Sequence, residues 1–85
     1  MSIEYARLHS LTAREIISAL NRDGFRYRPG KKGTGSHQRF QHPDGRRVTV
    51  TFHKSSDTFP PKTLKSMFEQ ARWTEDDLRR LNLLH

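Results

Sequence analysis

The fold is decided by the stretch GSHQRFQHPDGRRVTV, residues 35–50. Val48 and Val50 alternate with polar residues, and Phe40 is flanked by polar residues in the same way, which is the period-two pattern of half-buried strands. The four residues between the two runs read His-Pro-Asp-Gly. Proline suits the first central position of a type I turn, and glycine suits the left-handed bulge position that follows. Residues 37–53 are therefore predicted to form a β-hairpin.

The turn also determines which side chains share a face. It places Phe40 opposite Val48, so that the apolar residues of both strands lie on one side, as a defined register requires. The other side is expected to be exposed, cationic and rich in hydroxyl groups, and it carries His37, Arg39, Gln41, Arg47, Thr49, Thr51 and His53. On this pairing His37 stands at the start of a strand on an accessible surface.

Length and composition indicate a small domain without disulfides. The chain has 85 residues and no cysteine, so we expect one domain over residues 1–85, with neither a disulfide framework nor a zinc–thiolate site. No apolar run approaches the roughly 20 residues that span a membrane. Glu4 and Arg7 interrupt any signal-peptide pattern. The expected compartment is the cytoplasm.

The charge balance favours a polyanionic partner. Sixteen Lys and Arg residues outnumber nine Asp and Glu residues, which gives a formal net charge of +7. Such an excess in a small domain points first to nucleic acid. A membrane surface and an acidic protein are the other candidates, and a basic solvated surface without a specific partner is the remaining interpretation.

Helix signals precede the hairpin. Thr12 and Glu15 have the spacing of a capping box. Gly24 suits the left-handed position at the end of a helix. We therefore expect a helix over residues 12–23, after a loose N-terminal lead at residues 1–10.

A short strand and two further helices complete the expected order. Residues 25–28 read Phe-Arg-Tyr-Arg, which predicts a strand with its aromatic side chains toward the core and its arginines toward water; base stacking by these aromatic side chains is the alternative. Pro60 and Pro61 suit the start of a second helix, whose apolar stripe is Leu64, Met67, Phe68 and Ala71. Thr74 opens a short C-terminal helix within residues 74–85.

This order predicts an α+β fold with the sequence of elements α-β-β-β-α. One three-stranded antiparallel sheet with helices packed on one face buries all of these apolar stripes. That arrangement is the topology of double-stranded-RNA-binding domains.

Several motifs occur together in a specific order. They are Leu11-Thr12-x-x-Glu15, Gly35-Ser36-His37, His42-Pro43-Asp44-Gly45-Arg46-Arg47-Val48-Thr49-Val50 and Thr63-Leu64-Lys65-Ser66-Met67. Over roughly residues 11–80 the chain resembles the HicA family of bacterial and archaeal toxins, the toxin half of HicA–HicB toxin–antitoxin pairs. The chain departs from the family pattern at Thr51, where proline is frequent, and at Lys62 and Arg72, where glycines are common.

The resemblance implies a double-stranded-RNA-binding-like fold, an endoribonuclease that cleaves mRNA, and a HicB antitoxin that covers the active site. The family's catalytic histidine corresponds to His37, and Gly35 and Ser36 match the other positions of its motif. No cofactor is implied.

Histidine chemistry is compatible with this activity. RNA carries its own nucleophile, the 2′-OH, so that cleavage needs a group that accepts or donates a proton near neutral pH, and cations that stabilise the developing charge. His53 is a possible auxiliary group, whereas His42, beside the turn, is expected to be structural. The candidate phosphate contacts are Lys31, Lys32, Arg39, Arg46, Arg47 and Lys54.

Other functions remain open at this level. A non-catalytic RNA-binding module with the same fold is the main alternative, and a DNA-binding or purely protein-binding domain is a third. A metal site is disfavoured, because the histidines lack tight ligand spacing and no paired acidic residues accompany them. A Ser–His–Asp hydrolase is also disfavoured, because no orienting acid is evident for Ser36 and His37.

Overall fold

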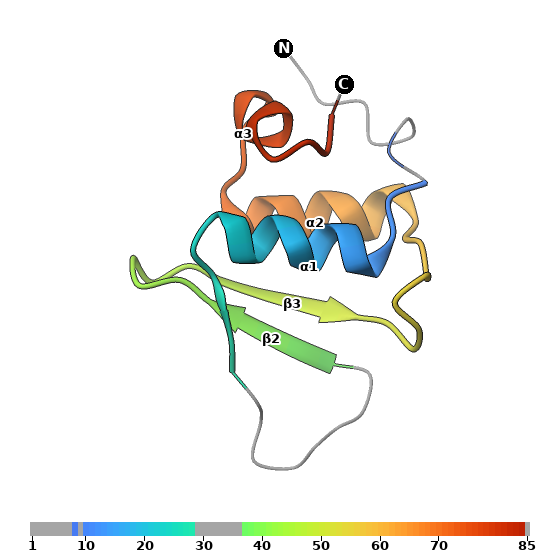
Figure 1. Ribbon diagram of the computed structural model, residues 1–85, viewed down its shortest axis with the longest axis horizontal. Helices are drawn as coiled ribbons and strands as arrows, with labels where there is room; N and C mark the ends of the chain where they lie inside the picture. The colour runs from blue at the N-terminus through green and yellow to red at the C-terminus, as the bar shows by residue number, and fades with distance from the viewer. Residues whose placement is uncertain (1–7, 9, 29–36, 85) are drawn as a thin grey trace.

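The structure is a computed structural model that describes residues 8, 10–28 and 37–84. Its elements follow the expected order (Figure 1): α1 (Ala13–Arg22), β1 (Arg26–Tyr27), β2 (His37–Gln41), β3 (Arg47–Thr51), α2 (Pro61–Ala71) and α3 (Glu75–Arg80). The predicted α+β class and α-β-β-β-α layout are confirmed.

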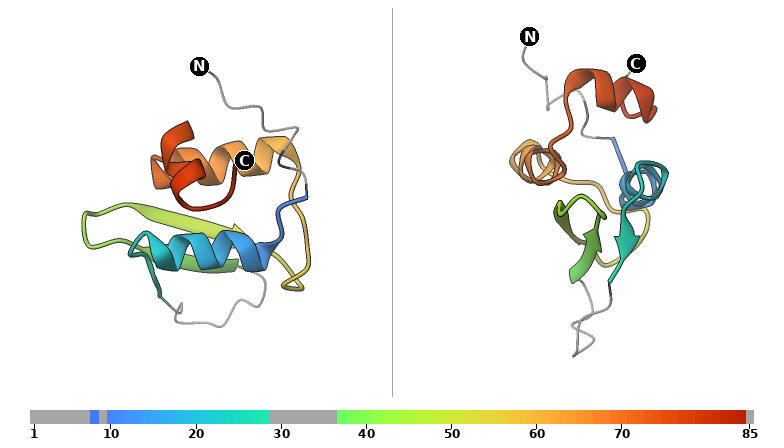
Figure 2. Two further views of the ribbon diagram at one scale, coloured as in Figure 1. Left: turned by 45° about the horizontal axis from the view of Figure 1, so that its top comes forward. Right: turned by 90° about the vertical axis from the view of Figure 1, so that its left-hand side faces the viewer.

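The molecule is built in layers. The strands form one antiparallel sheet in the order β1-β2-β3. Helices α1 and α2 lie side by side on one face of this sheet, and α3 lies on the far side of the helix pair (Figures 1 and 2). The other face of the sheet is not covered by any of the three helices; we call it the helix-free face.

The hairpin has the register that its turn predicts. Phe40 pairs with Val48, and Gln38 pairs with Val50. The N–H of Gly45 donates to the carbonyl of His42 over 2.9 Å. Gly45 has a φ of 101°, the left-handed conformation that a hairpin bulge requires of its glycine.

The helix ends also match their sequence signals. The Thr12 hydroxyl accepts from the N–H of Glu15, and the Glu15 carboxylate accepts from the N–H of Thr12. Thr74 and Asp77 form the same reciprocal box at the start of α3. Each box satisfies N–H groups that a helix start would otherwise leave without a partner.

The core is one cluster of apolar side chains shared by the sheet and the helices. Its largest fully buried members are Phe25, Phe68, Ile16, Leu20, Leu64, Leu78, Val48 and Val50. Leu78 and Leu81 belong to the same cluster, so α3 docks on its own chain. Leu8 joins the cluster as well; of the expected lead at residues 1–10, only Leu8 and Ser10 are among the described residues.

The first strand corrects one expectation. Phe25 is fully buried, as predicted, but Tyr27 is 50% exposed. Tyr27 pairs with Phe40 on the helix side of the sheet, with ring centroids 5.7 Å apart. Because β1 is an edge strand of two residues, this ring sits at the rim of the core, against Phe40 and solvent, rather than inside it.

One departure from the HicA-like pattern has a backbone explanation. Arg72 ends α2 with a φ of 57°. This left-handed conformation is the usual place for glycine after a helix, because a Cβ is strained there. No helix in the described part of the chain is long and apolar enough to cross a membrane.

Candidate active site

The candidate catalytic histidine lies where two strands meet. His37 begins β2 and pairs with Thr51, the last residue of β3. Both side chains are exposed, and the imidazole Nδ1 lies 3.1 Å from the Thr51 hydroxyl. Among the described residues Nε2 has no hydrogen-bond partner, so the hydroxyl orients the ring and leaves the second nitrogen accessible.

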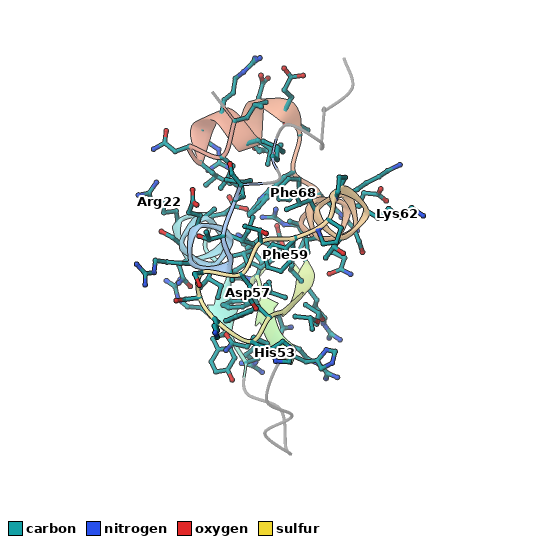
Figure 3. All side chains as sticks on the ribbon, turned by 90° about the vertical axis from the view of Figure 1, so that its right-hand side faces the viewer. Arg22, His53, Asp57, Phe59, Lys62 and Phe68 are labelled. Atoms are coloured by element: carbon teal, nitrogen blue, oxygen red, sulfur yellow. The ribbon has the colours of Figure 1, made fainter. Side chains whose placement is uncertain are left out.

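The loop after β3 is held against the start of α1. The Asp57 carboxylate accepts from the N–H groups of His53 (2.9 Å) and Lys54 (3.1 Å). The Asp57 carbonyl accepts from the N–H of Ala13 over 2.8 Å. Hydrogen bonds from the backbone N–H groups of His53 and Lys54 lower the pKa of Asp57, because they favour the carboxylate. Figure 3 shows His53 and Asp57 at this end of the molecule.

The auxiliary role of His53 stays a prediction. The hairpin strand ends at Thr51, so His53 lies in the loop rather than on the sheet. It is exposed, at the same end of the sheet as His37. No contact joins these two histidines in the described structure, nor does one join His37 to Lys54.

Two of the predicted phosphate contacts lie on the helix-free face together with His37. Arg39 and Arg47 are exposed there. The strand pairing adds Arg26 and Arg28, because Arg26 pairs with Gln41 and the N–H of Arg28 donates to the Arg39 carbonyl over 2.8 Å. The sequence pattern predicts only that these two arginines face solvent. The pairing of β1 with β2, which the pattern does not reveal, places them beside Arg39.

The sequence of this chain matches a family of toxins. A family model described as the HicA toxin of bacterial toxin–antitoxin systems matches residues 13–73, a segment that includes the whole sheet and both helices packed on it. The chain belongs to the HicA toxin family. A search of curated proteins gave no match.

In this HicA chain Arg46 occupies an internal position instead of the helix-free face. Its side chain is 15% exposed. One guanidinium nitrogen, Nη1, donates to the Ala71 carbonyl (2.6 Å) and to Asp23 (3.2 Å), and Nε donates to Asp44 (2.7 Å). The guanidinium carbon lies 4.9 Å from the centre of the Phe25 ring. These contacts engage the guanidinium group of Arg46, which would have to be free to bind a phosphate.

His42 is structural, as its place beside the turn predicts. Its Nε2 lies 2.9 Å from the Asp23 carbonyl, and its Nδ1 accepts from the N–H of Asp44 over 3.1 Å. The ring meets Phe25 edge-on, with centroids 5.1 Å apart. Both nitrogens therefore have partners within the fold.

The remaining predicted positions lie outside the described residues. They are Lys31, Lys32, Gly35 and Ser36. Within residues 8, 10–28 and 37–84, no group of three or more His, Asp or Glu side chains is placed to hold a metal ion.

Proposed function

We propose that this HicA toxin is a metal-independent endoribonuclease that cleaves mRNA, with His37 as its general acid or base. The observation that carries the proposal is the accessible imidazole of His37, whose Nδ1 lies 3.1 Å from the Thr51 hydroxyl, on a sheet face that also carries exposed arginines. Membership of the HicA toxin family supports the same reading.

The reaction needs one proton removed and one delivered. The RNA 2′-oxygen attacks the adjacent phosphorus as its O–H bond breaks. The bond from phosphorus to the 5′-oxygen then breaks, leaving a 2′,3′-cyclic phosphate and a 5′-hydroxyl once that oxygen is protonated. A neutral imidazole accepts the first proton, or an imidazolium supplies the second. Arginines stabilise the charge that develops on the phosphate oxygens.

A HicB-type antitoxin is the proposed protein partner. A toxin with a net charge of +7 and a cationic surface around its histidine is complementary to an acidic protein surface. Such a partner, bound over His37, would exclude RNA from the site.

The test compares RNA cleavage by the unmodified chain and by His37→Ala in EDTA. We expect the substitution to lower the cleavage rate by about 10²–10⁴, the usual contribution of a general acid or base. A second variant, His53→Ala, removes an exposed histidine at the same end of the sheet and tests the auxiliary role; its loss of activity is expected to be smaller than that of His37→Ala. Circular dichroism of all three proteins checks folding.

The alternatives give different results. Equal cleavage by the unmodified chain and His37→Ala would place the activity elsewhere. RNA binding that depends on salt, without cleavage by any variant, would favour the non-catalytic RNA-binding module. Loss of cleavage in EDTA that returns with added Mg²⁺ would contradict the metal-independent mechanism.

A further inference from the structure

We infer that the substrate is bound as a single strand on the helix-free face, with its phosphates held by Arg26, Arg28, Arg39 and Arg47. This inference rests on the proposed function and names the surface that grips the RNA. Of the six cations expected from the sequence, this set keeps Arg39 and Arg47, and it adds Arg26 and Arg28. Arg46 and Lys54 are left out, and Lys31 and Lys32 lie outside the described residues.

The strand pairing arranges the side chains of this face in three rows. The row nearest the hairpin turn is Arg26, Gln41 and Arg47, the middle row is Arg28, Arg39 and Thr49, and the last row is His37 and Thr51. Side chains two residues apart on a strand are about 6.7 Å apart, and neighbouring strands are about 4.8 Å apart. Two rows of arginine therefore lead directly to the catalytic histidine.

The charge on this face is of one sign. None of the positions in the three rows carries a carboxylate. Among the described residues, the side chains of Arg28, Arg39 and Arg47 have no ion-pair or hydrogen-bond partner, and Arg26 donates only to the Phe25 carbonyl over 3.1 Å. The free positive charge of the sheet is thus concentrated where a polyanion would lie.

The helix side of the molecule carries charges of both signs. Its cations are interspersed with acidic residues: Arg79 pairs with Glu75 over 2.7 Å, and Arg80 pairs with Asp23 over 2.9 Å. Glu15 and Glu69 are exposed there as well. A mixed surface of this kind attracts a phosphate chain less than the helix-free face does.

The face also offers a hollow of suitable chemistry. An open depression of about 290 Å³ lies between β1 and the hairpin turn, and its lining includes Arg26, Arg28 and Gln41. Two guanidinium groups and an amide beside one hollow match the needs of a phosphate group, which takes up hydrogen bonds and positive charge together.

Single-stranded RNA fits this face better than a duplex or a base-reading contact. In-line attack by a 2′-oxygen requires a backbone that can leave the A-form geometry, which a single strand does readily. The three rows contain no Phe, Tyr or Trp residue, and their one aromatic ring is the imidazole of His37. They therefore provide no extended platform for base stacking. Binding is therefore carried by the phosphates, with little preference among bases.

The experiment measures RNA affinity in the His37→Ala background, where the RNA stays intact. A fluorescent single-stranded RNA of mixed sequence is titrated at salt concentrations from 50 to 200 mM. Arg39→Gln with Arg47→Gln is compared with Lys62→Gln and Lys65→Gln, which remove the same charge from exposed positions on α2. Figure 3 shows Lys62 on the outer flank of the helix layer.

Each phosphate contact on a single strand contributes about 0.7 to the slope of log affinity against log salt. The arginine pair is thus expected to lower the slope by about 1.4, which makes the loss of affinity between 50 and 200 mM about sevenfold smaller. The lysine pair is expected to keep the slope of its parent, and an equimolar duplex of the same sequence is expected to bind more weakly than the single strand.

Other results would overturn the inference. Equal changes in slope for both pairs would indicate diffuse attraction, an effect of the lysine pair alone would place the RNA on α2, and tighter binding of the duplex would contradict a single strand. The inference can fail while the proposed function stands: if His37→Ala abolishes cleavage while the arginine pair keeps the full slope, the protein is a nuclease and the proposed binding surface is wrong. The proposed function fails alone if the arginine pair lowers the slope but the unmodified chain does not cleave RNA. If the unmodified chain neither binds nor cleaves RNA, both fail.

Discussion

At the scale of single residues, the contact between His37 and Thr51 is the feature on which catalysis is proposed to depend. The Thr51 hydroxyl lies 3.1 Å from the imidazole Nδ1. In this chain the ring is therefore oriented by the neighbouring strand. Because a hydroxyl can donate to Nδ1 or accept from it, this contact orients the ring with either tautomer.

We expect Thr51→Val to lower the cleavage rate by about 2- to 10-fold, the kinetic equivalent of one hydrogen bond. Thr51→Ser keeps the hydroxyl and should restore most of the rate. The deciding measurement is kcat and KM for the same RNA, where the loss should lie in kcat for the valine variant and should be reversed in the serine variant. A valine variant with unchanged kcat would mean that Thr51 does not position His37.

At the scale of elements, one cluster joins the ends of four of them. The Asp23 carboxylate, 10% exposed, accepts from Trp73 Nε1 (2.9 Å), from Arg46 and from Arg80. Arg46 also reaches the carbonyl of Ala71. The C-terminal end of α1, the hairpin turn, the end of α2 and helix α3 are thereby tied together, away from His37.

Arg46 and its neighbour Arg47 form a matched pair for testing this cluster. Arg46→Ala is expected to lower the free energy of unfolding by about 2–4 kcal/mol, because it removes the hydrogen bond to the carbonyl of buried Ala71 and the ion pair with Asp23. Arg47→Ala removes an exposed arginine and should change it by no more than about 0.5 kcal/mol. Urea unfolding measures both values. Similar losses for the two variants would show that the cluster contributes little.

At the scale of the whole molecule, the two ends have different tasks. The hairpin turn and the C-terminal ends of α1 and α2 lie at one end, and the start of β2, the end of β3 and the loop that follows lie at the other (Figure 1). The first end carries the hydrogen-bonded Asp23 cluster. The second end carries exposed His37 and His53, which leaves these side chains accessible to a ligand.

The Asp23 cluster predicts how stability depends on pH. Burial by itself raises the pKa of Asp23, but hydrogen bonds from Trp73 and Arg80 and the charges of Arg46 and Arg80 outweigh it, so the pKa is lowered from 3.8. The unfolded chain then binds this proton at a higher pH than the folded chain. The contribution to stability is therefore present above pH 3.8 and is lost as the pH falls through the lower folded pKa.

Urea midpoints measured between pH 2.5 and pH 7 should be nearly constant above about pH 5 and should fall below about pH 4. Asp23→Asn should be less stable near neutral pH and should show a shallower acid decline. The remaining decline belongs to other carboxyls such as Asp77, where a backbone hydrogen bond from Thr74 lowers the pKa. An acid decline as steep as that of the unmodified protein would contradict the role of Asp23.

Features that depend on neighbouring residues can be predicted from the sequence. Both capping boxes, the left-handed glycine of the turn, the pairing of Phe40 with Val48 and the exposure of His37 follow from short-range spacing, because caps, turns and strand alternation are local. The surroundings of the arginines, in contrast, depend on tertiary contacts. Arg46 finds Asp23 and Ala71, which are 23 and 25 positions away, whereas the pairing of β1 with β2 brings Arg26 and Arg28 beside Arg39. The same edge position leaves Tyr27 half exposed. Whether a charged or aromatic side chain is free depends on partners from distant segments, and these meet only when the chain folds.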